Sequence, residues 1–177
     1  MQRVILDLCG GSGAWSTPYR DAGYDVRLVT LPDHDVRLYR NPGEVWGILA
    51  APPCTVFASS GARWPRTDRD YVEAIGVVDA CLRLVTVCRP QWWCLENPVG
   101  KLVQWLGKPQ HYFDPCDYGD PYTKKTALWG SFTMPPKSRV QPVGKSPIHH
   151  MAPSPERAAL RSVTPAGFAK AFFAANP

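Results

Sequence analysis

The 177-residue sequence lacks several patterns that would assign it to a familiar class. Its six cysteines form no Cys-x-x-Cys pair and show no ligand-like spacing to histidine, which argues against a zinc site. His149-His150 lies in a proline-rich stretch and is expected to face solvent rather than bind metal. No apolar run approaches the roughly 18 residues that a membrane-spanning helix needs. We therefore expect no metal and no membrane partner.

The chain start and the composition point to an intracellular globular domain. Met1-Gln2-Arg3 runs directly into an apolar segment, so no secretory signal is expected, and the cysteines are expected to be reduced thiols in the cytoplasm. The length is typical of one domain, and 45% apolar residues suffice for a core. A net charge of +5 favours polyanionic partners, and we expect a monomer.

Strand-like and helix-like segments alternate along the chain. A long helix is expected after Thr67, which can cap it, and shorter helices are expected after Ser16, around Leu102–Leu106 and after Thr164. Short apolar runs predict strands at Val4–Leu8, Asp25–Leu31, Trp46–Ala51, Gln91–Leu95, Tyr112–Cys116 and Thr126–Phe132. This alternation predicts an α/β fold whose mostly parallel sheet is covered by helices on both faces.

A glycine-rich turn follows the first predicted strand. The segment from Asp7 to Gly13 lets the backbone approach a ligand closely, since glycine adopts positive φ without strain. It is not the GxGxxG pattern, so a nucleotide-sugar ligand without pyrophosphate fits better than a dinucleotide, although such a turn can also be purely structural. Asp35 can accept a hydrogen bond from an adenine amino group or can be a solvated loop acid. A ribose-binding acid is missing after the second strand or is displaced to Asp33.

A cysteine and a glutamate follow two neighbouring strands. Cys54 comes after Pro52-Pro53 in a stiff loop, where a helix N-terminus or a cation would favour the reactive thiolate. Cys81, Cys88 and Cys94 have the pattern of core residues instead. Glu96 ends an apolar run, so its pKa should be raised, which suits it to protonate or hold a ring nitrogen.

Four motifs in order resemble the catalytic motifs of DNA cytosine-5 methyltransferases, over roughly residues 3–132. They are Asp7-Leu-Cys-Gly-Gly-Ser-Gly, Pro52-Pro-Cys-Thr, Leu95-Glu-Asn-Pro and Tyr118-Gly-Asp-Pro-Tyr-Thr-Lys-Lys-Thr-Ala-Leu-Trp. The pairing of Pro-Pro-Cys with Glu-Asn at this spacing is specific, whereas each alone is weak.

The resemblance implies a Rossmann-like fold that binds S-adenosylmethionine and methylates C5 of cytosine in DNA. Cys54 would add to C6 of the base while Glu96 engages N3, with Lys124 as the third catalytic residue. The implied cofactor contacts are Asp7, Gly11, Gly13, Asp33, Asp35 and Pro52. The implied contacts to the base and its strand are Pro53, Ser59, Arg63, Asn97 and Lys125. A phage-encoded short form would act in the host cytoplasm.

The sequence also departs from that family. Its Glu-Asn-Val becomes Glu96-Asn97-Pro98, and its Gln-x-Arg-x-Arg becomes Tyr122-Thr-Lys124-Lys-Thr126, so Lys124 alone keeps a cation at the first arginine's place. Lysine cannot copy a bidentate guanidinium, and looser ring positioning is expected. The asparagine-containing loop that closes over the cofactor in the family is also absent.

A target recognition domain usually precedes the terminal helix in this family. Here only residues 133–163 fill that interval, and we expect a basic, proline-rich loop within a single catalytic domain spanning 1–177. Its cations can bind phosphates without reading sequence, or can simply solubilise the loop. We expect low sequence specificity. Single-stranded and duplex DNA both stay open as substrates, and single-stranded DNA needs no flipping of the cytosine out of a duplex.

Two other functions remain open at the level of sequence. The same cysteine and glutamate could modify free cytidine nucleotides, for which no recognition domain is needed. The chain could also be a non-catalytic DNA-binding relic of the family, which the missing ribose acid and lost arginines favour. Retention of both Cys54 and Glu96 argues against a relic, since binding alone requires neither.

Overall fold

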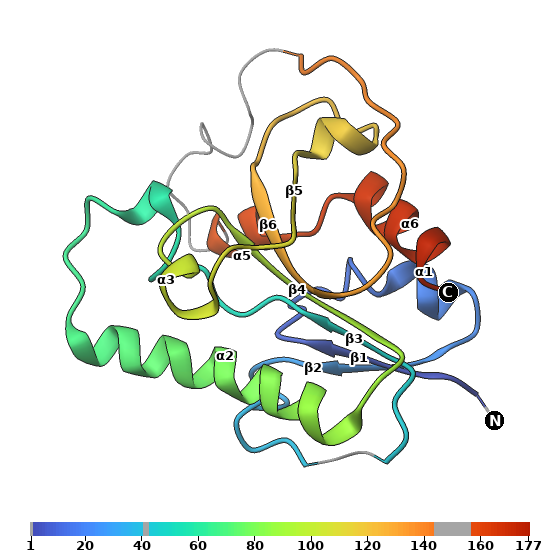
Figure 1. Ribbon diagram of the computed structural model, residues 1–177, viewed down its shortest axis with the longest axis horizontal. Coiled ribbons are helices and arrows are strands. Elements are labelled where there is room, and N and C mark those ends of the chain that lie inside the picture. Colours follow the sequence, from blue (N-terminus) through green and yellow to red (C-terminus); the bar gives the residue numbers. More distant parts are fainter. Residues whose placement is uncertain (1, 41–42, 144–156) are drawn as a thin grey trace.

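A computed structural model describes residues 2–40, 43–143 and 157–177 (Figure 1). Its six strands form one sheet in the order β2-β1-β3-β4-β6-β5. The strands are β1 (Val4–Leu8), β2 (Asp25–Val29), β3 (Gly47–Ala50), β4 (Trp92–Pro98), β5 (His111–Phe113) and β6 (Thr126–Ser131).

Five of the six strands point the same way. β2, β1, β3 and β4 are joined by parallel pairings, whereas β6 is antiparallel to β4 and β5 is antiparallel to β6. β5 therefore runs with the first four, and β6 alone is reversed. The predicted α/β fold with a mostly parallel sheet is confirmed.

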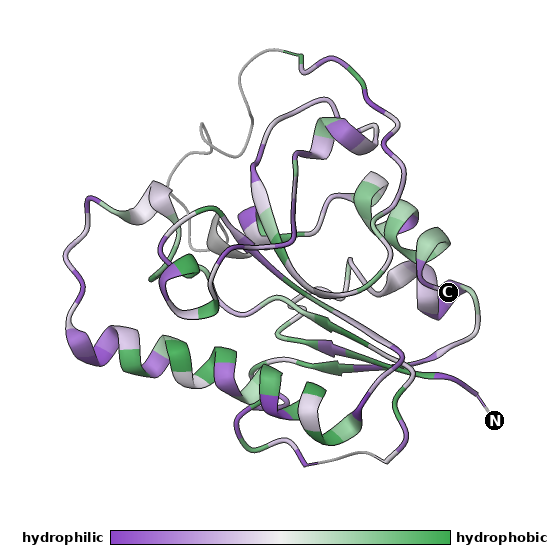
Figure 2. Cartoon of the chain, in the orientation of Figure 1, coloured by the Kyte–Doolittle hydropathy of each residue, from purple (hydrophilic) through white to green (hydrophobic). Residues whose placement is uncertain are grey.

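Helices cover both faces of this sheet (Figure 1). Alternate side chains of each strand point to opposite faces, so Ile5 and Leu6 enter different cores. Leu6 packs in the core beneath α2 (Asp68–Cys88), and Ile5 packs in the core beneath α1 (Thr17–Asp21) and α6 (Ala166–Ala175). Figure 2 shows apolar residues along the strands and on α6. It also shows that apolar and polar residues alternate along α2.

The long helix α2 begins as its sequence predicts. The side chain of Thr67 accepts a hydrogen bond from the backbone N–H of Asp70, and the Asp70 carboxylate accepts one from the backbone N–H of Thr67. This reciprocal cap satisfies two backbone donors that the first turn leaves unpaired. The helix ends at Cys88, where Arg89 adopts a left-handed conformation before Pro90.

Several predicted boundaries and caps are wrong. Ser16 occupies the predicted N-cap position of α1, but its hydroxyl bonds to Asp7 and makes no cap bond. Pro165, not Thr164, occupies the cap position of α6, without a side-chain cap bond. β4 continues past Glu96 to Pro98 because β6 extends its pairing beyond the end of β3. The helix expected around Leu102–Leu106 is confirmed as α3 (Val103–Leu106), and a short turn of helix also occurs at η1 (Ser59–Gly61). The strand expected at Tyr112–Cys116 ends earlier, at Phe113, because η2 (Pro115–Tyr118) follows it.

The interval expected to be a continuous loop contains a helix. α5 (Arg157–Ser162) lies within residues 133–163, since Arg157 to Ser162 adopt helical backbone just before α6. Residues 144–156, which include Lys145 and His149-His150, lie outside the described residues. None of the helices in the described part of the chain has both the length and the apolar composition of a membrane span.

The terminal helix α6 is held by stacked aromatic rings. Phe168 is fully buried and stacks on Phe113 of β5, with ring centroids 3.8 Å apart and planes 13° from parallel. The hydroxyl of Tyr19 in α1 donates to the carbonyl of Asn176, 2.8 Å away. The end of the chain is therefore part of the core on this face of the sheet.

Replacing Phe168 by alanine should destabilise the protein by about 3–5 kcal/mol, as for other fully buried phenylalanines. The free energy of unfolding from urea denaturation measures the effect. Lys170→Ala on the exposed side of the same helix should change it by less than about 0.5 kcal/mol. Equal effects of the two substitutions would contradict the packing described for α6.

Candidate functional site

Three segments meet at the edge of the sheet where β1 and β3 end. The turn from Asp7 to Gly13 follows β1, Pro52-Pro53-Cys54 follows β3, and Glu96 lies one residue past Leu95, which pairs with Ala50 at the last position of β3. Because β1, β3 and β4 are adjacent and parallel, their carboxyl ends open at the same edge. The register brings Cys54 and Glu96 to neighbouring strand ends.

The sheet also decides which face these groups occupy. Asp7 lies two residues after Ile5 on β1, and Glu96 lies two residues after Cys94 on β4. Residues two apart on a strand point to the same face of the sheet. Ile5 and Cys94 both belong to the core beneath α6, so Asp7 and Glu96 lie on that same face. The segment before α6 lies on this face too and contributes Ser162 and Thr164 to the site.

The structure encloses a small cavity at this edge, of about 50 Å³. Cys54, Glu96 and Lys124, which come from three separate motifs, all line it. So do residues of the glycine turn and of the segment before α6. The full lining is Asp7, Cys9, Gly10, Gly11, Trp15, Ala51, Pro52, Pro53, Cys54, Glu96, Pro98, Lys124, Ser162 and Thr164.

The loop that carries Cys54 is fixed to the end of β4 by hydrogen bonds. The side-chain amide of buried Asn97 donates to the carbonyl of Pro52 across 2.9 Å. The Cys54 carbonyl accepts bonds from the backbone N–H groups of Phe57 and Ala58, which closes a turn after the cysteine. Asn97 was predicted to contact the substrate, but in the structure its amide nitrogen holds the Pro-Pro-Cys loop.

A second set of contacts continues this attachment. The backbone N–H of Ser59 donates to the carbonyl of Val99, and that of Lys101 donates to the carbonyl of Phe57. Gly100 lies between them, and a Cβ at this position would fall only 2.0 Å from the Phe57 oxygen. Glycine is required here because the two backbones approach so closely.

Burial, modified by nearby charges, determines the protonation of Cys54 and Glu96. Burial raises the pKa of the Cys54 thiol, the Glu96 carboxylate raises it further, and Lys124 lowers it by a smaller amount. Lys124 is a neighbouring cation that favours the thiolate, as expected, but burial and Glu96 outweigh its effect. Cys54 is therefore a thiol at neutral pH. Burial also raises the pKa of Glu96, as expected, with Lys124 opposing the shift.

Lys124 connects the cavity to its cover. Its ammonium group donates a hydrogen bond to the carbonyl of Arg161 in α5, 2.9 Å away. The side chain is partly buried, and its charge acts on both Cys54 and Glu96. Lys124 therefore holds α5 over the cavity and reduces the repulsion between the thiolate and the carboxylate.

Asp7 is the buried acid of the glycine turn. The hydroxyl of Ser16 donates to its Oδ2 at 2.5 Å, whereas Oδ1 has no hydrogen-bond partner among the described residues. Burial raises the pKa of Asp7 to about 6, with the Ser16 bond opposing the shift. A Cβ on Gly10 would overlap the Asp7 carboxyl group, so the turn passes directly over this acid. An unpaired buried oxygen at the cavity suits a ligand that carries a hydrogen-bond donor or a cation.

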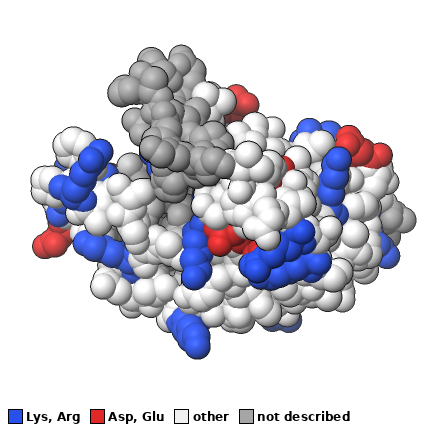
Figure 3. All heavy atoms as spheres, turned by 90° about the horizontal axis from the view of Figure 1, so that it is seen from above, with Lys and Arg blue, Asp and Glu red and all other residues white. Residues whose placement is uncertain are grey.

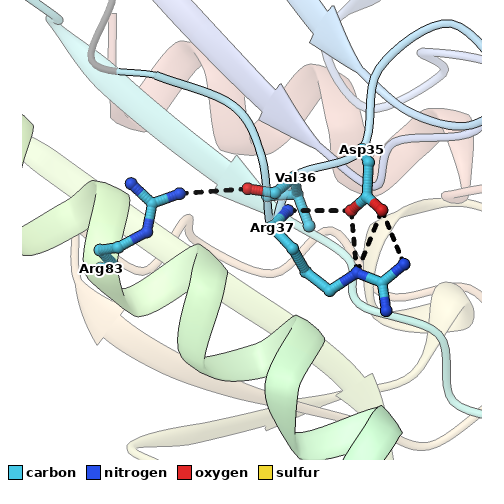
Figure 4. A network of polar contacts seen from close by, with 4 residues as sticks. All are labelled: Asp35, Val36, Arg37 and Arg83. Atoms are coloured by element: carbon cyan, nitrogen blue, oxygen red, sulfur yellow. Dashed lines mark hydrogen bonds and ion pairs between the residues drawn. The ribbon is translucent and has the colours of Figure 1, made fainter.

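The two predicted adenine and ribose acids do not line the cavity. Asp33 is exposed, and Asp35 forms an ion pair with Arg37 whose shortest distance is 2.6 Å (Figure 4). The same loop is tied to α2, because Arg83 donates to the Val36 carbonyl. Asp35 nevertheless influences the glycine turn, since its charge raises the pKa of Cys9 while a hydrogen bond with Cys81 lowers it more.

The other predicted strand contacts also lie outside the cavity. The Ser59 hydroxyl donates to the Val99 carbonyl, the Arg63 guanidinium lies over the ring of Trp64, and the Lys125 ammonium lies over Tyr112. Gly13 shapes the turn at positive φ, and its carbonyl accepts from Ser16 and Thr17. Ser59 instead lines a larger groove beside the Cys54 loop.

Two cations of the predicted basic segment have a structural partner. Lys137 and Arg139 both pair with the buried carboxylate of Asp117, at 2.9 Å each. Their bonds hold the pKa of Asp117 low despite its burial. Figure 3 shows basic side chains at several places on the face seen there, with acidic side chains beside some of them. Phosphate binding by Lys137 and Arg139 would have to compete with Asp117.

Sequence reasoning missed three residues that shape the site. Ser16 was interpreted as a helix cap, but it bonds to Asp7; Gly10 permits the approach of the turn to that acid; and Trp15 lines the cavity. The spacing of Ser16 from Asp7 carries no recognisable signal.

Across the described ranges, no three His, Cys, Asp or Glu side chains group as they would around a metal ion.

The chain resembles a solved methyltransferase-like structure. It aligns over 86% of its length with 56% of the chain of a prophage-encoded Escherichia coli protein that has been proposed to be a DNA modification methyltransferase, at a TM-score of 0.55 and 19% identity. The chain thus spans a little over half of that protein. No known protein family and no curated protein matched the sequence. At this identity the likeness shows the fold alone: a mixed, mostly parallel sheet resembling that of a methyltransferase.

Replacing Glu96 by glutamine should lower the pKa of the Cys54 thiol, because it removes the carboxylate that raises it. Lys124→Met should raise that pKa, because it removes a cation that lowers it. The midpoint of the pH profile for alkylation by iodoacetamide, followed by mass spectrometry on the peptide containing Cys54, measures both shifts.

Lys125→Met is the matched control for this experiment. Lys125 is exposed and does not line the cavity, so its removal should leave the midpoint near the wild-type value. Shifts in the same direction for Glu96→Gln and Lys124→Met would contradict the described arrangement of charges.

Gly100→Ala should destabilise the protein by about 1–3 kcal/mol, because the new methyl group overlaps the Phe57 carbonyl. Gly76→Ala provides the opposite control. Gly76 lies within α2 with open space around it, so alanine should stabilise by about 0.5–1 kcal/mol. Urea denaturation compares the two variants, and a stabilised Gly100→Ala protein would be inconsistent with the close backbone approach.

Proposed function

We propose that this protein transfers a methyl group from S-adenosylmethionine to C5 of cytosine in DNA through a covalent adduct with Cys54. The observation that carries the proposal is the shared cavity: Cys54, Glu96 and Lys124 line it together with Asp7 and the glycine turn. A nucleophile, an acid and a candidate cofactor turn are thereby brought to one edge of a sheet that resembles a methyltransferase fold.

The acid and the thiol have complementary roles in this reaction. Glu96, with its raised pKa, can retain a proton and share it with N3 of cytosine, which makes C6 electrophilic. Because the Glu96 carboxylate raises the pKa of Cys54, the thiolate forms more readily while Glu96 carries its proton and is uncharged. The sulfur then adds to C6, and C5 becomes nucleophilic and would take up the methyl group, with the rest of the cofactor released as a thioether. Elimination of the C5 proton and of the sulfur restores the aromatic ring.

The residues at the turn fit the proposed cofactor. S-adenosylmethionine, when bound, supplies an activated methyl group to the base. Its methionine part carries an ammonium group, and the unpaired Oδ1 of Asp7 is a suitable partner for it. Gly10 and Gly11 leave the backbone uncovered beside this acid. An ammonium partner would also lower the pKa of Asp7, which burial raises to about 6 despite the opposing bond from Ser16.

Entry of a base involves movement of the cover. Ser162 in α5 and Thr164, just before α6, line the cavity together with Cys54 and Glu96. The Lys124 bond to Arg161 is the contact that opening would break. In the proposed reaction, a flipped or single-stranded base gains access to Cys54 by displacing α5.

Incubation with S-adenosylmethionine labelled in its methyl group and with single-stranded or duplex DNA tests this function. The wild-type protein should label DNA, Cys54→Ala should lose all detectable transfer, and Glu96→Gln should lose roughly 100-fold or more, as for a general acid. Cys88→Ala is the control, because Cys88 does not line the cavity. Cys81 is less suitable, since its thiol interacts with Cys9 in the glycine turn.

Two further substrates separate this function from its alternatives. DNA containing 5-fluorocytosine should form a denaturation-resistant complex with the wild-type protein but not with Cys54→Ala, because fluorine cannot leave as a proton does. Tritium release from C5-labelled dCMP without release from DNA would instead indicate a nucleotide-modifying enzyme. DNA binding without labelling or trapping at any salt concentration would favour a non-catalytic relic.

A further inference from the structure

A second hollow on the described surface adjoins the candidate site but lies outside it. A groove of about 570 Å³ runs between the loop after Cys54 and the segment that precedes α3. Val56, Phe57 and Ala58 form one wall, and Gly100, Lys101 and Val103 form the other. None of the residues used in the proposed chemistry lines it.

The groove begins immediately beyond the reactive cysteine. Val56 is two residues from Cys54, a separation of at most about 7 Å along the chain. Arg66, which also lines the groove, donates to the carbonyl of Thr55 across 3.1 Å. A strand whose target base reached Cys54 would therefore have its neighbouring nucleotide at the groove.

Aromatic side chains are concentrated around the groove. The rings of Tyr71 and Trp105 stack with centroids 5.6 Å apart, and Phe57 meets Trp105 edge-on. Trp64 forms part of the lining and has 59% of its surface exposed, although tryptophan is normally well buried. An exposed ring of this size next to a groove is the kind of platform on which nucleic acid bases stack.

The charge of the groove matches a phosphate backbone. Arg66 and Lys101 line it, and no acidic residue does. Arg63 lies against Trp64 with its guanidinium 5.3 Å from the ring centroid. The Lys101 ammonium donates to the Tyr71 hydroxyl at 2.7 Å, which places the cation beside the stacked rings. Cations interleaved with aromatic rings distinguish a single-strand site from an apolar protein-docking surface.

We propose that this groove binds the nucleotides of a single-stranded DNA segment next to the target base, with Trp64 stacking on a base and Lys101 and Arg66 facing its phosphates. This inference rests on the proposed function for the identity of the strand. It supplies strand binding from within the catalytic domain itself. Because stacking tolerates any base, the groove would hold DNA without reading its sequence.

Binding of fluorescently labelled oligo(dT) of twelve nucleotides tests the groove separately from cytosine chemistry. Trp64→Ala should weaken the affinity roughly 5- to 100-fold, whereas Trp64→Phe, which keeps a ring, should retain most of it. Lys101→Gln should reduce the slope of log affinity against log salt by about 0.7. The controls are Leu38→Ala and Lys170→Gln, an exposed apolar residue and an exposed cation that do not line the groove.

The outcomes separate this inference from the proposed function. Trp64-dependent binding of oligo(dT) supports the groove even if no methyl transfer occurs. Transfer to cytosine DNA with equal oligo(dT) affinity in wild type and Trp64→Ala overturns the groove and leaves the function standing. Absence of oligo(dT) binding at low salt also overturns it, as does loss of a wild-type dimer in Trp64→Ala, which would assign the groove to a contact between two copies of the chain.

Discussion

The candidate site depends on the attachment of one loop to the end of one strand. The backbone bonds between residues 57–59 and 99–101, together with the Asn97 bond to Pro52, fix the position of Cys54 relative to β4. Glu96 is part of β4, so the thiol and the carboxylate have little freedom to move apart. The close approach at Gly100 makes this attachment tight. All electrostatic coupling between the two groups follows from it.

That coupling gives the site a resting state and a reactive state. Burial and the Glu96 carboxylate raise the pKa of Cys54 and keep it protonated, while Lys124 opposes this shift. A ligand that neutralises Glu96 changes this balance in favour of the thiolate. Activation of the nucleophile would then accompany substrate binding, and an unoccupied site would keep its thiol in the less reactive form.

The sequence predicted the strands and the long helix well because these elements have strong local signals. β1, β3 and α2 lie within a residue or two of their expected bounds, and the Thr67 cap follows from a local pairing with Asp70. The role of Ser16 could not be predicted, since its bond to Asp7 arises only when β1 and α1 pack together. The end of β4 was missed for a similar reason, because its last residues pair with β6, about 30 residues later.

In the candidate site, too, local motifs could be predicted from the sequence, whereas contacts between distant segments could not. Motifs that resemble a known family located Cys54, Glu96 and Lys124, and all three line one cavity. The raised pKa of Cys54 and the Asn97 tether depend on burial and on contacts between distant segments, which motifs do not encode. Asp35 illustrates the converse: its position after a strand suggested a ligand, but its nearest partner is Arg37, two residues away.

The reversed direction of β6 has a consequence for how this fold tolerates change. Glu96 stands on a part of β4 that extends beyond β3 and is paired only with β6, where Leu128 lies opposite it and His111 of β5 lies opposite Leu128. The carboxylate thus projects from a three-stranded ribbon whose alignment is determined by the connections on either side of β5. An insertion that slipped β6 by one position would exchange its side chains between the two cores, because Ala127 and Trp129 pack on one face and Leu128 on the other. The packing beside the acid would then change, although Glu96 itself stays on β4. Connecting segments distant in sequence from the acid therefore affect its surroundings.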